Sequence, residues 1–360
     1  MVDGYGGFTT CSHDEQTTVG GVSDSSFASL TTLRVGGTPA DLIRCTHAEE
    51  LAATVARLDA AGTPLLVVGG GSNLLVAEGQ LDIVAVVAQN AGISLLDATS
   101  SPSHATLRIG AGTVWDDVVA YAVEHGLAGI EALSGIPGSA GATPVQNVGA
   151  YGAEIADVLT RVRLYNRETK KDEWVPASAL ELAYRYSNLK FTNRAVVLEL
   201  EIELERRELS APLRHLGGKR VPLAEARASV LETRRQKGMV LDPEDHDTWS
   251  AGSFFTNPVV DTALAEQIER EVGEEGMPRF AQPDGREKLS AAWLIERAGF
   301  PRGFPGEDAP ARLSTKHTLA LTNRGRASAD DIADLARRVQ RGVEKRFGVA
   351  LVPEPVWVGL

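Results

Sequence analysis

Two polar residues stand in settings that could serve proton transfer. Ser253 follows a glycine and precedes two phenylalanines in residues 251–258. Its hydroxyl either caps a turn or donates a proton to a strongly basic acceptor, such as a carbanion or an enolate. Glu354 stands between two prolines, which hold the backbone extended. A carboxyl held near apolar residues can have a raised pKa and act as an acid, although a surface glutamate is the alternative.

A third candidate is an arginine flanked by aromatic residues. Arg185 lies between Tyr184 and Tyr186. A planar guanidinium held between rings could point at a carboxylate, and an exposed arginine on a strand is the alternative. Ser187 and Lys190 match the SxxK pattern of serine acylases, but the chain lacks the SDN and KTG partners that would support this function.

Two glycine-rich segments, residues 67–75 and 134–152, are suited to binding phosphate. An apolar run at 64–68 predicts a buried strand, after which three glycines could turn backbone N–H groups toward an anion. In the second segment, Pro137 and Pro144 make a stiff loop. The alternatives are an ordinary strand–helix turn and a packed Ω-loop. Neither segment matches the Rossmann or P-loop pattern. The two loops together indicate a ligand with a long diphosphate that is bound without either of these motifs.

A basic cluster could grip the same diphosphate. Arg234, Arg235 and Lys237 follow one another closely, with Lys219 and Arg220 upstream. Two of these cations on one helical turn could bind a diphosphate, or the cluster could be a solvated helix face.

Composition limits the possible partners and ligands. The chain has 360 residues and a net charge of −12, which argues against nucleic-acid or anionic-membrane partners. Only Cys11 and Cys45 are present, and the seven histidines form no metal-binding motif. We therefore expect no metal and a reducing, cytoplasmic setting. The glycine-, serine- and threonine-rich residues 1–28 predict a disordered leader rather than a signal peptide.

The periodicity predicts mixed α and β structure. Helical spacing indicates helices, and short apolar runs bounded by turn residues indicate strands. The expected helices are 48–61, 114–125, 223–236, 262–272, 290–298 and 329–347. The expected strands are 65–68, 83–87, 106–109, 160–165, 196–205 and 318–322.

Seven motifs, taken in order, resemble those of the UDP-N-acetylenolpyruvoylglucosamine reductase family, and the resemblance runs from about residue 30 to the C-terminus. The motifs are residues 32–37, 68–75, 134–154, 184–187, 252–258, 288–295 and 352–354.

The resemblance implies an α+β protein with an FAD-binding domain of the vanillyl-alcohol-oxidase (PCMH) type over residues 29–206, made of two subdomains. A smaller α+β substrate-binding domain with a C-terminal catalytic segment would cover residues 207–360. FAD would be the cofactor and NADPH the reductant, in a monomer. The implied cofactor-binding residues are Gly69, Gly70, Gly71, Ser72, Asn73, Leu74, Ser134, Gly135, Ile136, Pro137, Gly138, Gly141, Ala142, Gln146, Asn147, Gly149, Tyr151 and Gly152.

The resemblance also implies the chemistry. Hydride from the reduced flavin would reach C3 of an enolpyruvyl group on a UDP-sugar, giving UDP-N-acetylmuramate for peptidoglycan. Arg185 and Glu354 would stabilise the enolate-like intermediate, and Ser253 would protonate C2. Candidate substrate contacts are Tyr184, Arg234, Lys237, Asn257 and Lys288.

The chain departs from the family pattern at residues 212–222. Part of the family has a loop tyrosine over the UDP-sugar there, and this segment has none. Two rival functions are a flavin oxidase of the same fold and a flavin- or nucleotide-binding sensor without turnover. The oxidase gives no reason for the Ser253 and Glu354 segments, and a sensor would not return electrons to a substrate.

Overall fold

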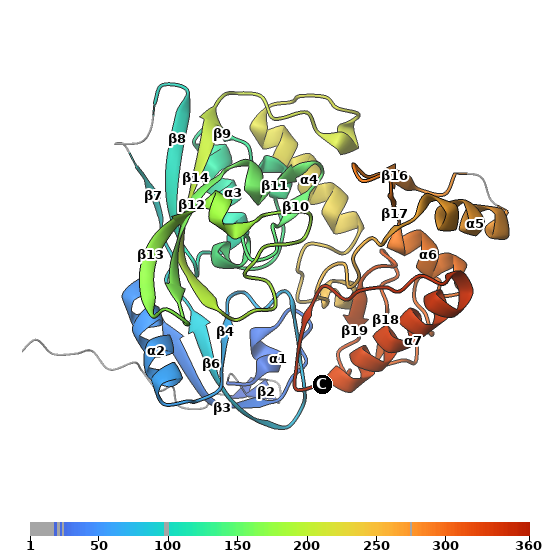
Figure 1. The fold of residues 1–360 in the computed structure, drawn as a ribbon, viewed down its shortest axis with the longest axis horizontal. Coiled ribbons are helices and arrows are strands. Elements are labelled where there is room, and N and C mark those ends of the chain that lie inside the picture. The colour runs from blue at the N-terminus through green and yellow to red at the C-terminus, as the bar shows by residue number, and fades with distance from the viewer. Residues whose placement is uncertain (1–17, 20–21, 24, 97–100, 274–275) are drawn as a thin grey trace, which may run out of the picture.

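The computed structural model describes residues 18–19, 22–23, 25–96, 101–273 and 276–360. Two larger sheets form the N-terminal part, and helices with short strands form the C-terminal part (Figure 1). The helices are α1 (Phe27–Leu30), α2 (Ala48–Ala60), α3 (Trp115–Glu124), α4 (Leu223–Gln236), α5 (Thr262–Val272), α6 (Ala291–Arg297) and α7 (Ala329–Phe347). The strands are β1 (Thr18–Val19), β2 (Val22–Ser23), β3 (Thr38–Cys45), β4 (Leu65–Val68), β5 (Leu74–Val76), β6 (Gln80–Ala88), β7 (Ile93–Leu95), β8 (His104–Gly110), β9 (Leu127–Ala128), β10 (Gly149–Ala150), β11 (Ala153–Glu154), β12 (Leu159–Asn166), β13 (Lys171–Pro176), β14 (Ala195–Arg206), β15 (Val259–Val260), β16 (Arg279–Ala281), β17 (Glu287–Leu289), β18 (Ala311–Leu313), β19 (Leu321–Asn323) and β20 (Val356–Val358).

The first sheet is parallel, in the order β3-β6-β4, and leads into the first glycine-rich loop. Helix α2 forms because Leu51, Val55 and Leu58 recur on one face, and all three are buried. The same core includes Tyr165 and Leu198 of the second sheet, so α2 is held between the two sheets. This packing holds strand β4 in place where it leads into the first glycine-rich loop.

The second sheet is antiparallel, in the order β13-β12-β14-β8-β7. Its inner face packs against α3 and the segment that leads to the second glycine-rich loop. Trp115 at the start of α3 is 1% exposed, and its indole N–H donates to the carbonyl of Leu133 at 3.3 Å. This contact fixes the chain where the second loop begins.

The C-terminal core surrounds α7. Residues of α5, α6 and α7 pack with the pair β18–β19, and Leu33, Val35 and Leu75 of the N-terminal part join the same cluster. The two parts of the chain therefore share one apolar core.

The C-terminal segment also returns to the N-terminal part. Strand β20 pairs in parallel with β5, with Val356 opposite Leu74. Figure 1 shows this last segment, in red, running from the C-terminal helices back toward the blue N-terminal part. Because β5 follows the first glycine-rich loop directly, the pairing places Glu354 beside that loop.

The predicted division between residues 206 and 207 falls at the end of β14, and helix α4, which follows it in the sequence, packs back against the part that precedes it. Helix α4 packs against α3 and the 3₁₀ helix Glu131–Leu133, both in the N-terminal part. Arg227 of α4 forms an ion pair with Asp116 of α3, at 2.6 Å between Nη1 and Oδ1. Helix α4, predicted as part of the substrate-binding domain, thus contacts residues of the predicted FAD-binding domain.

Two sequence predictions need correction, and some strands were not predicted. The disordered leader cannot extend to residue 28, because Phe27 is fully buried and its N–H donates to the carbonyl of Gly37 at 2.8 Å; residues 1–17 lie outside the described ranges. The strand expected at 318–322 is β19, Leu321–Asn323, because the Thr318 hydroxyl instead donates to Glu296 in a turn. Strands β3 and β13 were not predicted.

Candidate active site

Both glycine-rich loops line one cleft of about 650 Å³. Its walls also include apolar side chains of β4 and β14 and residues from the segments around Ser253 and Glu354. Of the predicted cofactor-binding residues, those that line this cleft are Gly69, Gly70, Gly71, Ser72, Asn73, Leu74, Ile136, Pro137, Gly138, Gly141, Ala142, Gln146 and Gly149.

The glycines are needed because the two loops touch each other. A Cβ atom added to Gly70 would lie 2.6 Å from the Cα of Gly138, and one added to Gly69 would lie 2.2 Å from the hydroxyl oxygen of Ser139. Gly71 has φ +60°, and a Cβ there would lie 1.8 Å from the carbonyl oxygen of Leu30. Gly69 and Gly70 thus permit contact between the two loops, and Gly71 permits the close approach of Leu30.

Three predicted cofactor-binding residues do not line the cleft and instead hold the second loop in place. The Ser134 hydroxyl is buried and donates to the carbonyl of Glu131 at 2.7 Å. The Gly135 N–H donates to Oδ1 of Asp116 at 2.6 Å. Asn147 is 1% exposed and donates to Oε2 of Glu154 at 2.7 Å. These contacts hold the second glycine-rich loop in place through residues that do not line the cleft.

Tyr151 and Gly152 face a different segment. The Tyr151 ring lies 4.8 Å from the ring of His215, between centroids, and 6.0 Å from Nζ of Lys237. A Cβ on Gly152 would lie 2.8 Å from Nε of Arg214. Residues 212–222, which lack the loop tyrosine, thus supply a histidine that packs on Tyr151. The contact with Lys237 places Tyr151 near one of the predicted substrate residues.

All three predicted catalytic residues line the cleft. Nε of Arg185 lies 3.7 Å from Oε2 of Glu354, and its Nη2 donates to the carbonyl of Gly149 at 2.7 Å. Ser253 precedes Phe254, whose carbonyl accepts the N–H of Glu354 at 2.9 Å. Segments far apart in the sequence therefore bring a cation, a carboxyl and a hydroxyl to one surface.

The carboxyl of Glu354 is largely buried. The residue is 8% exposed, and burial raises the pKa of its carboxyl, although the positive charges of Arg185 and Lys190 oppose this shift. Its carbonyl accepts the side-chain N–H of Asn73 at 3.2 Å, and the same amide also donates to Oε1 of Gln146 at 3.3 Å. Asn73 thus connects both glycine-rich loops to the Glu354 segment.

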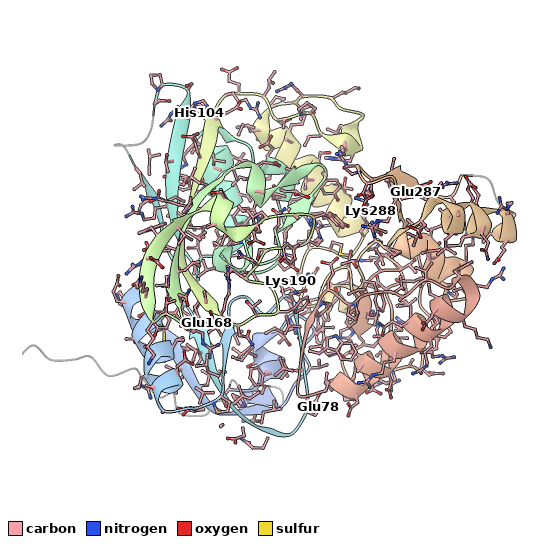
Figure 2. All side chains as sticks on the ribbon, in the orientation of Figure 1. Glu78, His104, Glu168, Lys190, Glu287 and Lys288 are labelled. Carbon is pink, nitrogen blue, oxygen red and sulfur yellow. The ribbon has the colours of Figure 1, made fainter. Side chains whose placement is uncertain are left out.

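Lys190 is a residue of the site that the sequence did not identify. It lines the cleft, and its Nζ donates to the carbonyl of Arg185 at 3.0 Å. Burial lowers the pKa of Lys190. Figure 2 shows it near the centre of the molecule. The SxxK match contained this lysine, but its serine, Ser187, is fully buried and donates to the carbonyl of Val145, which leaves it no role as a nucleophile.

The predicted substrate residues divide into two groups. Arg234 lines the cleft, and Lys237 is exposed nearby. Tyr184 and Lys288 meet outside the cleft lining, with Nζ of Lys288 4.3 Å from the centroid of the Tyr184 ring; Figure 2 places Lys288 toward the C-terminal part. Asn257 accepts the N–H of Ala291 at 3.0 Å, at the start of α6.

The residues present fit a bound FAD. The glycine-rich loops can receive a diphosphate, and the apolar side chains of Leu66, Val67 and Val197 can cover an aromatic group. The buried Nε of Arg234 has no hydrogen-bond partner in the described part of the chain, as expected of a donor that faces an absent anion. Among the described residues, no cluster of three or more His, Cys, Asp or Glu side chains could hold a metal. Within the same residues, no helix is both long and apolar enough to cross a membrane.

Comparisons with known proteins identify the domains and the relatives of this chain. Residues 39–170 match the model of an FAD binding domain, and residues 242–358 match that of the UDP-N-acetylenolpyruvoylglucosamine reductase C-terminal domain. The chain is 58% identical to UDP-N-acetylenolpyruvoylglucosamine reductase 2 of Corynebacterium glutamicum, over 94% of each chain. It is 54% identical to the reductase of Nocardia farcinica, over 92% of this chain and 88% of the relative.

A solved structure gives the same assignment. The crystal structure of UDP-N-acetylenolpyruvylglucosamine reductase from Thermus caldophilus is similar with a TM-score of 0.63 at 25% identity, covering 92% of this chain and 97% of that one. The fold and cleft define an FAD-dependent oxidoreductase with a PCMH-type cofactor domain. The chain belongs to the UDP-N-acetylenolpyruvoylglucosamine reductase family.

Proposed function

We propose that the protein reduces UDP-N-acetylglucosamine enolpyruvate to UDP-N-acetylmuramate, a peptidoglycan precursor, with NADPH as the reductant. The names of the relatives support the substrate, and the matched FAD domain supports the cofactor. The observation that carries the proposal is the convergence of Arg185, Ser253 and Glu354 on the cleft that both glycine-rich loops line. Bound FAD would accept hydride from NADPH and pass it to the substrate.

In this proposal Arg185 and Glu354 stabilise the negative charge that develops on the enolpyruvyl group. The guanidinium of Arg185 donates to the carbonyl of Gly149, and Lys190 donates to the backbone carbonyl of Arg185, so the side chain and its backbone are both anchored before the charge forms. A raised pKa keeps Glu354 protonated at higher pH than an exposed glutamate, and a protonated carboxyl can donate a hydrogen bond to the enolate oxygen.

Ser253 donates the proton that completes the reaction at C2. A serine hydroxyl is a weak acid, so it protonates only a strongly basic centre, and the enolate carbon is such a centre. Its place in the cleft beside the Glu354 segment supports this role. In the same proposal Arg234, which lines the cleft, and Lys237, whose Nζ lies 6.0 Å from the centroid of the Tyr151 ring, contact the diphosphate of the UDP-sugar.

The two half-reactions of Ser253→Ala test the assignment. We expect NADPH to bleach the flavin absorbance of the variant at the wild-type rate under anaerobic conditions. We expect its recovery on adding the enolpyruvyl substrate to slow by about 10²–10⁴-fold, the typical contribution of a proton donor. Thr256→Val, which removes a nearby hydroxyl that does not line the cleft, is the control and should leave both steps near wild type.

Equal slowing of both half-reactions in Ser253→Ala would refute the role of Ser253. A wild-type protein whose flavin is reoxidised only by oxygen would favour an oxidase, and one whose flavin is never reoxidised would favour a sensor.

We further propose that the protein acts as a cytoplasmic monomer without nucleic-acid or membrane partners. The net charge of −12 supports the absence of nucleic-acid and membrane partners, because it would repel nucleic acids and anionic membranes at long range.

A further inference from the structure

The motif at residues 32–37 joins the two parts of the chain. None of the proposed cofactor, substrate or catalytic residues belongs to it. Leu33 and Val35 pack in the apolar core of the C-terminal part. The side-chain amide of Asn323, on β19, donates to the carbonyls of Leu33 and Arg34 at 3.0 and 3.2 Å. This segment of the N-terminal part is therefore fixed to the C-terminal part.

Thr32, the first residue of the motif, connects the first glycine-rich loop to the segment of Ser253. It lines the cleft and is 6% exposed. Its backbone N–H donates to the carbonyl of Gly71 at 3.2 Å, and its hydroxyl donates to the carbonyl of Ser250 at 2.7 Å. A single residue is thus bonded both to a loop that lines the cofactor cleft and to the chain just before Ser253.

The bond to Ser250 bears on Ser253 because the turn between them is short and anchored at both ends. Oγ of Ser250 accepts the N–H of Gly252 at 3.2 Å, and Gly252 has φ +71°, a conformation that favours glycine. On the other side of Ser253, the N–H of Phe254 donates to the carbonyl of Leu319 at 2.8 Å. Ser253 is therefore held between two anchored residues, and a movement of Ser250 also moves its hydroxyl.

We propose that Thr32 is a positioning residue for the proton donor, an inference that rests on the proposed function. Its hydroxyl holds the carbonyl of Ser250 and, through the turn, sets the place of the Ser253 hydroxyl relative to the first glycine-rich loop. The proton moves from this hydroxyl to C2 of the enolate-like intermediate, so its rate depends on the distance and angle between the two groups. Hydride transfer from NADPH to the flavin does not use Ser253 and should not depend on Thr32.

The test is Thr32→Val, which keeps the shape of the side chain and removes its hydroxyl. Both half-reactions of the FAD-loaded protein are followed by anaerobic stopped-flow absorbance. We expect NADPH to reduce the flavin at the wild-type rate. We expect reoxidation by UDP-N-acetylglucosamine enolpyruvate to slow about 10- to 100-fold, as small displacements of a reacting group do. Thr32→Ser, which restores the hydroxyl, should recover most of this rate.

Thr31→Val is the matched control. Thr31 is also 6% exposed, and its hydroxyl donates to the carbonyl of Val35 at 3.2 Å, within the same segment. The substitution removes a buried hydroxyl that makes no bond to the Ser253 turn, so both half-reactions should keep their wild-type rates. Thr32→Ala provides a second variant without the hydroxyl if Thr32→Val does not fold or retain FAD. Equal slowing of both half-reactions in the Thr32 variants, or the same slowing in Thr31→Val, would overturn the inference.

A double substitution shows whether Thr32 acts through Ser253. In Ser253→Ala no hydroxyl is left to be positioned, so adding Thr32→Val should slow reoxidation by less than about twofold more. A further slowing as large as that of the single Thr32→Val substitution would contradict the inference, because the effects of independent sites multiply.

The wild-type protein separates this inference from the proposed function. If the substrate reoxidises the wild-type flavin and reoxidises that of Thr32→Val equally fast, the inference alone is wrong. If the substrate does not reoxidise the wild-type flavin, the proposed function is wrong, and the role of Thr32 falls with it.

Discussion

Asp116 connects the second glycine-rich loop to two helices, and Asp116→Asn tests this connection. Its carboxylate accepts three hydrogen bonds, one from the N–H of Gly135 at 2.6 Å and two from Arg227 at 2.6 and 2.8 Å. Asparagine keeps an oxygen that Gly135 can use, but it loses the charge and turns an amide N–H₂ toward the guanidinium. The substitution therefore removes the bidentate pair while preserving the size of the side chain.

The expected loss of unfolding free energy in Asp116→Asn lies between two limits. Hydrogen bonds to charged groups contribute about 1.5–3 kcal/mol each when buried, whereas exposed ion pairs contribute about 0–1 kcal/mol. The Asp116 side chain is 32% exposed and that of Arg227 is 19% exposed. We therefore expect the free energy of unfolding to fall by about 1–2 kcal/mol at neutral pH. The loop also loses an anchor, so we expect weaker FAD binding as well.

The loss of stability in Asp116→Asn should become smaller as the pH falls. Burial opposes ionisation of Asp116, but hydrogen bonds from Arg227 and Gly135 outweigh it and hold the pKa of the carboxyl below its usual value. A group with a depressed pKa contributes stability above its unfolded pKa, about 3.9, and loses it as the pH falls through the folded pKa. The difference between wild type and Asp116→Asn should thus be full above about pH 5 and shrink in more acidic solution.

The assay is urea-induced unfolding of the FAD-free proteins, followed by circular dichroism at several pH values. Asp117→Asn is the control, because Asp117 is the exposed next residue of α3 and its loss changes the net charge equally. Equal destabilisation by both substitutions, or a difference that persists unchanged in acid, would refute the reasoning.

Two further substitutions test other parts of the site. In the wild type, reoxidation of reduced flavin by the enolpyruvyl substrate should slow as the pH rises through the raised pKa of Glu354, because the neutral donor is lost. Stopped-flow pH profiles should show this fall disappear in Glu354→Gln, and its persistence there would assign it to another group. Gly70→Ala should weaken FAD binding at least about tenfold, since a Cβ 2.6 Å from the Cα of Gly138 forces the loops apart. Quenching of FAD fluorescence measures this affinity, and unchanged binding would show that the loops can separate freely.

Local patterns predicted the elements with strong periodicity. The bounds of β4, α4, α5 and α7 agree with the structure, because their apolar spacing and end signals are unambiguous. Strand β13 (Lys171–Pro176) was missed because half of it is charged and it lies at a sheet edge, where its pairing with β12 outweighs its weak propensity. Phe27 was assigned to the leader because its packing partners, such as Val76, are distant in the sequence.

The candidate site was only partly predicted, because it also depends on contacts between residues that are distant in the sequence. Ordered motifs, and not periodicity, identified Arg185, Ser253 and Glu354, whose meeting depends on contacts across the whole chain. The role of Asn147 as a support rather than a surface of the cleft could not be seen, because it depends on Glu154 and the carbonyl of Ala183. Lys190 was missed because its importance comes from the carbonyl it contacts, which no local pattern records.

The pairing of β20 with β5 has a consequence for how the protein is made. Asn73 and Glu354 are separated by 281 positions, yet they form one connection. During synthesis the N-terminal part emerges first and can begin to fold before the C-terminal part exists. At that stage the strand that pairs with β5 and the carboxyl opposite Arg185 are both still missing. The site is therefore complete only after the segment around Glu354 has been synthesised and has paired with the N-terminal part.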